Sequence, residues 1–386
     1  MCHLPISVLA LLLLGCSSGD GEMGESAGAA PPGNVPAPPE ADLATGVSRL
    51  FVVGDSLSDV GNAASTVDYL LGRTIEPPTI GLCNPADVLA IPRGCDDLFY
   101  RQSRVSDGPL AVEHLAEHLG ISEVKPSFHV LPNGPKAGTD YAVASATARG
   151  QGVEDLARQV DLLLLDHRPL PANALYVVLI GGNDAIDALQ VATGGGSSAG
   201  QTSAEIVTAA VAAIGVNVER LLDFGGRRLV VANVPDLAAL PAVLRDAQAS
   251  SDAAAFLDTA SSISEAFNRE LAARLEQIAR NVRWNSSTPP VLVQFDLHAA
   301  LSAAAKTAAA NGHNTVDACF DSDAYRESAA AARVFHPDCA PQPGGPPRFA
   351  DFVFWDDIHP TGVTHAAIGS ALIERVEARS VNLFSG

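Results

Sequence analysis

Apolar residues after position 48 fall into two alternating patterns. Short continuous apolar runs are typical of parallel strands that are covered on both faces; they occur at 49–53, 175–180, 229–234 and 291–295, with a weaker one at 139–143. Apolar residues at helical spacing predict helices between and after these runs, at 108–119, 155–165, 204–222, 252–279, 297–310 and 361–378. Strands that alternate with helices predict an α/β fold, in which helices cover both faces of a parallel sheet.

Two long stretches lack either pattern, at 66–107 and 311–354. Loops of this length usually serve a function or are disordered. Each contains one pair of cysteines, so we expect both to be ordered. A third irregular stretch, 194–200, is rich in Gly and Ser but lacks the Lys of a phosphate-binding loop.

The N-terminal residues predict an export signal. The apolar run 9–14 is too short to span a bilayer and leads into Gly15-Cys16-Ser17, which resembles a bacterial lipobox with Cys16 as the lipidated residue. No Lys or Arg precedes the run, unlike most signals, and an ordinary cleaved signal peptide is the alternative. Residues 17–47 are rich in Gly, Ala and Pro and predict a disordered tether. The boundaries are thus 1–16 for the signal, 17–47 for the linker and 48–386 for the folded domain, and we expect an outer-membrane lipoprotein or a secreted protein.

Composition narrows the possible partners. With 47% hydrophobic residues among 386, the chain is long enough to bury a sizeable core. The net charge of −20 argues against nucleic-acid binding, which needs a positive surface, and against docking on anionic lipid. We expect contact with membrane only through a lipid on Cys16, a small-molecule or lipid ester as the binding partner, and a monomer.

The remaining cysteines suit an oxidising compartment. Apart from Cys2 and Cys16 the chain has four, which allow three pairings. We favour the pairs that are close in sequence, Cys83–Cys95 and Cys319–Cys339. No Cys-x-x-Cys spacing is present, so a zinc site is not expected, and the chemistry considered below requires no metal or organic cofactor.

Three short motifs carry candidate chemistry. Ser56 follows the first predicted strand within Gly54-Asp55-Ser56-Leu57-Ser58, where a nucleophile would be accessible, although a serine here is more often a helix cap. Asn183 follows the 175–180 run within Gly-Gly-Asn-Asp; its amide suits an oxyanion, while the same sequence is also ordinary turn chemistry. Asp356 and His359 are three residues apart, as a carboxylate and the imidazole that it orients would be. Separately, each motif has a structural explanation.

Together and in this order, the motifs resemble the GDSL family of the SGNH hydrolases. Supporting stretches are 59–62 (Asp-Val-Gly-Asn) and 105–109 (Val-Ser-Asp-Gly-Pro), which are similar to the branch of bacterial extracellular esterases and lecithinase-like lipases. The resemblance covers the chain from Arg49 to the last predicted helix. It implies a three-layer α/β/α sandwich of the flavodoxin-like kind, with a central parallel sheet of about five strands.

The resemblance also implies roles for residues. Ser56 would be the nucleophile, His359 the general base and Asp356 the acid that orients it. The oxyanion donors would be the Ser56 N–H, the Asn183 side chain and a backbone N–H that the family supplies from a glycine. Here both glycines of that stretch are replaced, by Ala144 and Ser145, so Ser145 would donate only if its backbone conformation tolerates a side chain.

Neighbouring polar residues are expected to have supporting roles. We expect Asp55 to structure its turn, Asp184 to brace the Asn183 loop, Asp357 to face solvent or a helix terminus, and His365 to lie on the surface of the last helix.

We therefore predict an exported serine esterase or lipase that hydrolyses small-molecule or lipid carboxylic esters, phospholipids included, through an acyl-enzyme on Ser56. An acyltransferase with the same triad is one alternative. A surface lipoprotein that binds a ligand without turnover is another, and the replaced glycines favour it.

Overall fold

The computed structural model describes the central and C-terminal parts of the chain, with gaps: 43–44, 46–63, 104–121, 124–130, 138–194, 201–281, 290–320, 335–340 and 347–378. All of these residues belong to one compact unit, 40–386. Cys16, Cys83 and Cys95 lie outside the described residues, as do the predicted signal peptide and most of 66–107.

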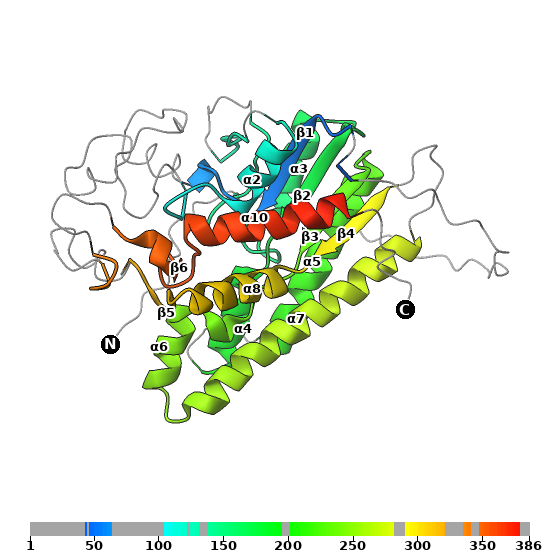
Figure 1. The fold of residues 1–386 in the computed structure, drawn as a ribbon. Coiled ribbons are helices and arrows are strands. Elements are labelled where there is room, and N and C mark those ends of the chain that lie inside the picture. Colours follow the sequence, from blue (N-terminus) through cyan, green and yellow to red (C-terminus); the bar gives the residue numbers. More distant parts are fainter. Residues whose placement is uncertain are drawn as a thin grey trace. The chain divides into compact units, whose positions relative to one another are not determined.

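Four parallel strands form the central sheet (Figure 1). Their order is β1 (Arg49–Gly54), β2 (Ala174–Leu179), β3 (Arg228–Ala232) and β4 (Val291–Phe295). Residues 139–143, expected as a weak strand, lie beside β1, where the Tyr141 N–H donates to the Val52 carbonyl at 2.8 Å. Only an isolated bridge between Val52 and Asp140 forms there, so this fifth strand is rudimentary.

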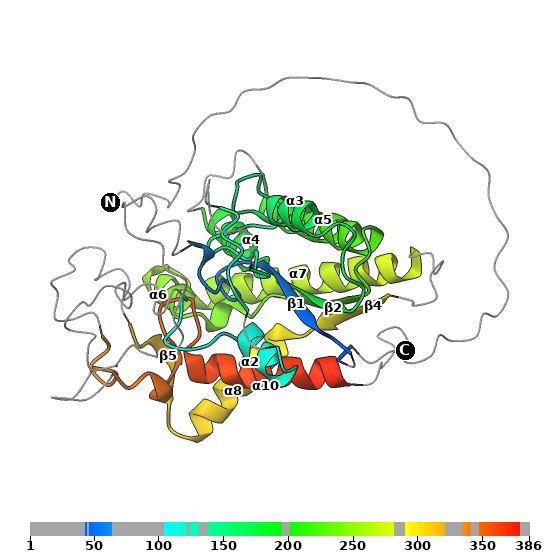
Figure 2. The ribbon, with the colours of Figure 1, turned by 90° about the horizontal axis from the view of Figure 1, so that it is seen from above.

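Helices cover both faces of the sheet (Figure 2). One layer holds α3 (Leu156–Asp166), α4 (Gly182–Ala192), α5 (Ser203–Asp223) and α7 (Ala253–Asn281). The other holds α2 (Ala111–His118), α8 (Leu297–Ala310) and α10 (Gly362–Glu377). The expected three-layer α/β/α fold is therefore confirmed. Within the described part of the chain, no helix is long and apolar enough to cross a membrane.

The long apolar helices form where the sequence pattern places them. Thr202 caps the N-terminus of α5: its hydroxyl accepts the Glu205 N–H while the Glu205 carboxylate accepts the Thr202 N–H, so two otherwise unpaired donors are satisfied. The buried residues of α5 recur every three or four positions and face the sheet; they include Ile206, Val207, Val211, Ile214, Val218 and Leu221.

Several short elements do not appear in the sequence pattern. They are α4, α6 (Pro241–Ala249), β5 (Asn314–Ala318) and β6 (Phe352–Phe354). α4 begins directly after β2, where the sequence suggests only a turn. Gly181 makes this possible: its φ is +116°, and a Cβ there would lie 2.5 Å from the Phe267 ring on α7. The glycine permits both the left-handed backbone and close helix packing.

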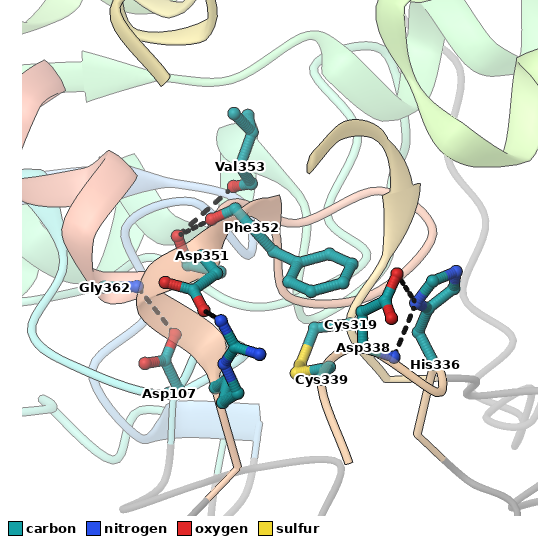
Figure 3. Close-up of a disulfide and its surroundings, with 11 residues drawn as sticks. Asp107, Cys319, His336, Asp338, Cys339, Asp351, Phe352, Val353 and Gly362 are labelled. Carbon is teal, nitrogen blue, oxygen red and sulfur yellow. Dashed lines mark hydrogen bonds and ion pairs between the residues drawn. A yellow bond between two sulfur atoms is a disulfide. The ribbon is translucent and has the colours of Figure 1, made fainter. Parts of the chain in front are cut away.

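A second small sheet lies in the region expected to be one long loop. β5 pairs with β6 in parallel, and a disulfide joins Cys319, just after β5, to Cys339 (Figure 3). The buried rings of Phe320, Phe352 and Trp355 pack in the same apolar cluster as this disulfide. Since Trp355 directly precedes Asp356, the cluster anchors the start of the loop that carries Asp356 and His359.

Candidate active site

Ser56 lies in the turn that follows β1. The turn is held by Gln159 of α3, whose side-chain oxygen accepts the Gly54 N–H and whose amide donates to the Gly54 carbonyl, both at 2.7 Å. Gln159 is fully buried and Ser56 is 8% exposed. A buried amide bonded to both backbone groups of one residue leaves that residue little freedom, so the serine is presented from a rigid support.

Asp55 structures the same turn, as the sequence suggests. Its carboxylate accepts the Leu57 N–H at 3.1 Å and is buried. Burial raises the pKa of Asp55 to about 7, against the lowering effect of the Leu57 N–H and of the charge of His359. Asp55 thus helps to hold the turn that carries Ser56.

Asp356 and His359 lie in the loop between β6 and α10. The His359 Nδ1 atom is 2.8 and 2.9 Å from the two Asp356 carboxylate oxygens, and His359 Nε2 is 2.8 Å from the Ser56 hydroxyl oxygen. With the ring proton on Nδ1 facing the carboxylate, Nε2 is the acceptor for the serine proton. Residues 303 positions apart in the chain are thereby brought into hydrogen-bond contact.

Asp356 is held as a carboxylate by its neighbours. Burial would raise its pKa, but the charge of His359, the hydrogen bond from that ring and the N–H groups of Ile358 and His359 outweigh burial and lower it. Those two N–H groups donate to Asp356 Oδ1 at 2.9 and 2.7 Å. A carboxylate that stays ionised can orient the imidazole and stabilise its cation.

Two hydrogen bonds from the segment 105–109 hold the end of the loop that carries Asp356 and His359. The Ser106 hydroxyl donates to the Pro360 carbonyl at 3.0 Å, and the Asp107 carboxylate accepts the Gly362 N–H at 2.7 Å (Figure 3). Gly362 is the first residue of α10, so Asp107 also places negative charge at the positive end of that helix. Pro360 and Gly362 lie directly after His359, so these two bonds hold the end of the loop next to the imidazole.

Three N–H groups are candidate oxyanion donors: the Asn183 amide, the Ser56 N–H and the Ser145 N–H. Asn183, in the first turn of α4, donates one amide hydrogen to the Ala146 carbonyl at 2.8 Å, which leaves its second amide hydrogen free. In the described part of the chain, neither the Ser56 N–H nor the Ser145 N–H has a hydrogen-bond partner. An oxyanion hole is built from N–H donors without protein partners, and these three groups are such donors.

Ser145 adopts the backbone conformation that a glycine would favour. Its φ is +69°, in the left-handed region, where a side chain is strained. Hydrogen bonds on both sides hold the segment: the Ala144 N–H donates to Asp59 Oδ2 at 2.8 Å, and the Ala148 N–H donates to Asp184 Oδ2 at 2.7 Å. These bonds hold Ser145 in its strained backbone conformation. Asp184 and Asn183 both bond to the residues that follow Ser145, at Ala148 and Ala146.

An apolar pocket opens beside Ser56, His359 and Asn183. Its walls come from η2 (Leu237–Ala239), α8, α10 and α4, and its apolar side chains include Leu237, Leu240, Leu297, Leu301, Ile186 and Ile368. A pocket with these apolar walls favours an aliphatic group as its occupant.

Of the expectations for neighbouring residues, the one for His365 is wrong. His365 is not on the surface: it is 2% exposed and lines the pocket. Its spacing from Ile368 and Leu372 on the buried face of α10 is the sequence signal for this. Asp357 lies at a helix terminus, one of the two expected places: its carbonyl accepts the N–H of Ala242 in the first turn of α6, and its side chain pairs with Arg245 at 2.7 Å.

No metal-binding group of three or more His, Cys, Asp or Glu residues occurs in the described ranges. The residues that the structure brings together are a serine, an imidazole, a carboxylate and N–H donors. Such an arrangement can carry out nucleophilic acyl transfer.

Comparisons with known proteins agree with this chemistry. The family model described as GDSL-like Lipase/Acylhydrolase matches residues 50–372. An Arabidopsis thaliana protein described as a GDSL esterase/lipase is 24% identical over 349 residues, which are 85% of this chain and 88% of that protein. A protein of Photorhabdus luminescens described as Lipase 1 is 28% identical over 205 residues, which are 51% of this chain and 24% of that protein.

Proposed function

The chain belongs to the GDSL-like lipase/acylhydrolase family and is a hydrolase of ester bonds, and we propose that it works through an acyl-enzyme on Ser56. The observation that carries this proposal is the continuous contact from Asp356 through His359 to the Ser56 hydroxyl, with 2.8 Å between His359 Nε2 and Ser56 Oγ. A serine hydroxyl is a weak nucleophile until a base removes its proton, and this geometry provides the base.

The reaction proceeds in two steps. His359 Nε2 takes the Ser56 proton while the serine oxygen attacks the ester carbonyl, and the Asn183 amide, Ser56 N–H and Ser145 N–H bind the oxyanion that forms. Collapse of this intermediate breaks the bond to the alcohol, which leaves with the proton from His359. Water then attacks the acyl-enzyme in the same way, and releases the carboxylic acid and free Ser56.

The pocket favours an aliphatic acyl group as its occupant. Leu237, Leu240, Leu297 and Leu301 offer an apolar surface beside Ser56, and burying a chain methylene there contributes about 0.8 kcal/mol. We therefore propose esters of aliphatic acids as substrates, a class that includes lipids. The alcohol part is left open by this argument.

Exchange of the nucleophile tests the mechanism. Ser56→Ala is expected to lose hydrolysis of p-nitrophenyl butyrate by at least about 10⁴-fold, because triad removal leaves only binding and oxyanion stabilisation. Ser58→Ala is the matched control: Ser58 is buried two residues away, and its hydroxyl donates to the Asp55 carbonyl at 3.4 Å. If Ser56→Ala retained wild-type turnover, the assignment would be wrong.

We also propose export and lipid attachment at Cys16. Support comes from the apolar run before Gly15-Cys16-Ser17 and from the Cys319–Cys339 disulfide, which suits an oxidising compartment. Expression in a Gram-negative host should place the wild type in the membrane fraction with a diacylglycerol-sized mass increase on Cys16. Cys16→Ser should lack both, and an unmodified, soluble wild-type protein would contradict the proposal.

A further inference from the structure

A backbone hydrogen bond connects α6 to the loop that carries the catalytic histidine. Leu240 directly precedes α6 and lines the pocket, and Ile358 of the loop lines the same pocket. The carbonyl of Asp357, the residue before Ile358, accepts the N–H of Ala242 in the first turn of α6 at 3.0 Å. The connection therefore lies next to two residues of the pocket wall.

The side chain of Asp357 makes a second connection to α6. Its Oδ2 atom is 2.7 Å from Nη1 of Arg245, three residues after Ala242. The Asp357 side chain is 14% exposed and that of Arg245 is 52% exposed. Neither side chain lines the pocket, so the pair acts on the pocket through the two elements that it joins.

The same wall is attached to α7 at its other end. The N–H of Leu237, the first residue of η2, donates to the hydroxyl of Ser264 on α7 at 3.0 Å. Leu237 and Leu240 are thus held from different sides, one by α7 and the other by Asp357. The attachment at Asp357 sets the distance between Leu240 and Ile358, because it joins the residues that follow the first and precede the second.

We propose that Asp357 and Arg245 are positioning residues for the acyl chain, because their ion pair keeps the Leu240 wall close to Ile358. The inference rests on the proposed function, since it takes the acyl chain to occupy this pocket. Dispersion attraction falls steeply with distance, and a gap of about 0.5–1 Å loses a quarter to a half of it. A wall released from the loop would therefore bind each methylene more weakly, while the hydrogen bonds within the triad remain.

Esters that differ only in acyl length separate this role from a role in the chemical step. The measured quantity is the ratio of kcat/KM for p-nitrophenyl octanoate to kcat/KM for p-nitrophenyl acetate. Arg245→Gln is expected to lower this ratio by about 2- to 5-fold, the effect of a partly exposed ion pair. An acetyl group has no chain to contact the wall, so a change in the triad alters both substrates alike and cancels in the ratio.

Further variants show whether the ion pair itself is responsible. Arg245→Lys keeps the positive charge on α6 and should retain most of the wild-type ratio. Asp357→Asn should lower the ratio as Arg245→Gln does, and the double variant should lower it no further, because both changes break one contact. Arg280→Gln breaks an exposed ion pair with Glu276 on α7, outside the pocket, and should keep the wild-type ratio.

Failure of the inference differs from failure of the proposed function. An unchanged ratio in Arg245→Gln and Asp357→Asn, or additive losses in the double variant, overturns the role of the pair and leaves the Ser56 mechanism intact. A wild type that hydrolyses acetate but not octanoate overturns it as well, because no acyl chain then occupies the pocket. Wild-type activity in Ser56→Ala overturns the mechanism itself, and the role of the pair with it.

Discussion

Asn183 donates a side-chain hydrogen bond to the Ala146 carbonyl at 2.8 Å. The bond fixes the amide plane, so the second amide hydrogen has one direction. It also joins α4 to the segment that carries Ser145, and therefore sets the two groups that we propose as oxyanion donors relative to each other. Preorganised donors of this kind do not need to reorient when charge develops.

Removal of the Asn183 amide is expected to slow the chemical step. Asn183→Ala should lower kcat by about 10²–10³-fold with little change in KM, because the donor acts on the oxyanion and not on the ground-state ester. Steady-state kinetics on p-nitrophenyl butyrate measure this. Asn217→Ala, a change at a buried asparagine on α5 away from the site, is the control. A rise in KM at constant kcat would contradict the assigned role.

Replacement of Ser145 by glycine should stabilise the protein. The left-handed backbone at φ +69° costs a side-chain-bearing residue about 1–2 kcal/mol, and glycine loses part of this gain through its more flexible unfolded state. Ser145→Gly is therefore expected to raise the free energy of unfolding by about 1 kcal/mol and to keep its activity, since the donor is a backbone N–H. Urea denaturation measures the change.

Ser145→Ala is the matched control, because it removes the hydroxyl and keeps the strained Cβ. We expect no gain in stability from it. Equal stabilisation by alanine and glycine would show that backbone strain at this position is not the cause.

The sequence predicts the site residues better than their surroundings. Ser56, Asn183 and His359 each lie in a motif at an element boundary, and the fold brings these boundaries to one edge of the sheet. The hydrogen bonds between Gln159 and Gly54 join residues 105 positions apart, so no local sequence pattern predicts them. Likewise the sequence does not predict α4, because two glycines indicate a turn, whereas the helix depends on how Gly181 packs against Phe267.

Stability should depend on pH through Asp55. Its pKa is about 7 in the folded protein and about 3.9 in an unfolded chain, so the folded state holds a proton that the unfolded state releases. The stabilisation is complete below about pH 4 and is lost as the pH rises through about 7. Relative to Asp55→Asn, the free energy of unfolding of the wild type should fall by at most about 1.4 kcal/mol per pH unit between pH 4 and pH 7.

Urea denaturation of both proteins at a series of pH values checks this dependence. The comparison uses only slopes, so a constant difference in stability between the two proteins does not matter. Parallel profiles between pH 4 and 7 would contradict the raised pKa.

The Cys319–Cys339 disulfide should stabilise both the domain and its site. It closes a loop with a sequence separation of 20, for which the chain-entropy argument gives about 3 kcal/mol. In a background without Cys83 and Cys95, dithiothreitol should lower the urea midpoint and the activity together, because the disulfide packs with Trp355 next to Asp356. Cys319→Ser/Cys339→Ser in that background should show the same loss without reductant. If dithiothreitol lowered the urea midpoint equally in the background protein and in its Cys319→Ser/Cys339→Ser variant, this disulfide would not be the cause.

Covalent labelling tests the central claim most directly. A fluorophosphonate should react with the folded wild-type protein in one-to-one stoichiometry, and peptide mass spectrometry should locate the adduct on Ser56, while Ser56→Ala stays unlabelled. An adduct on another residue, or no adduct on folded, full-length protein, would contradict an acyl-enzyme on Ser56 and favour a protein that binds its ligand without turnover.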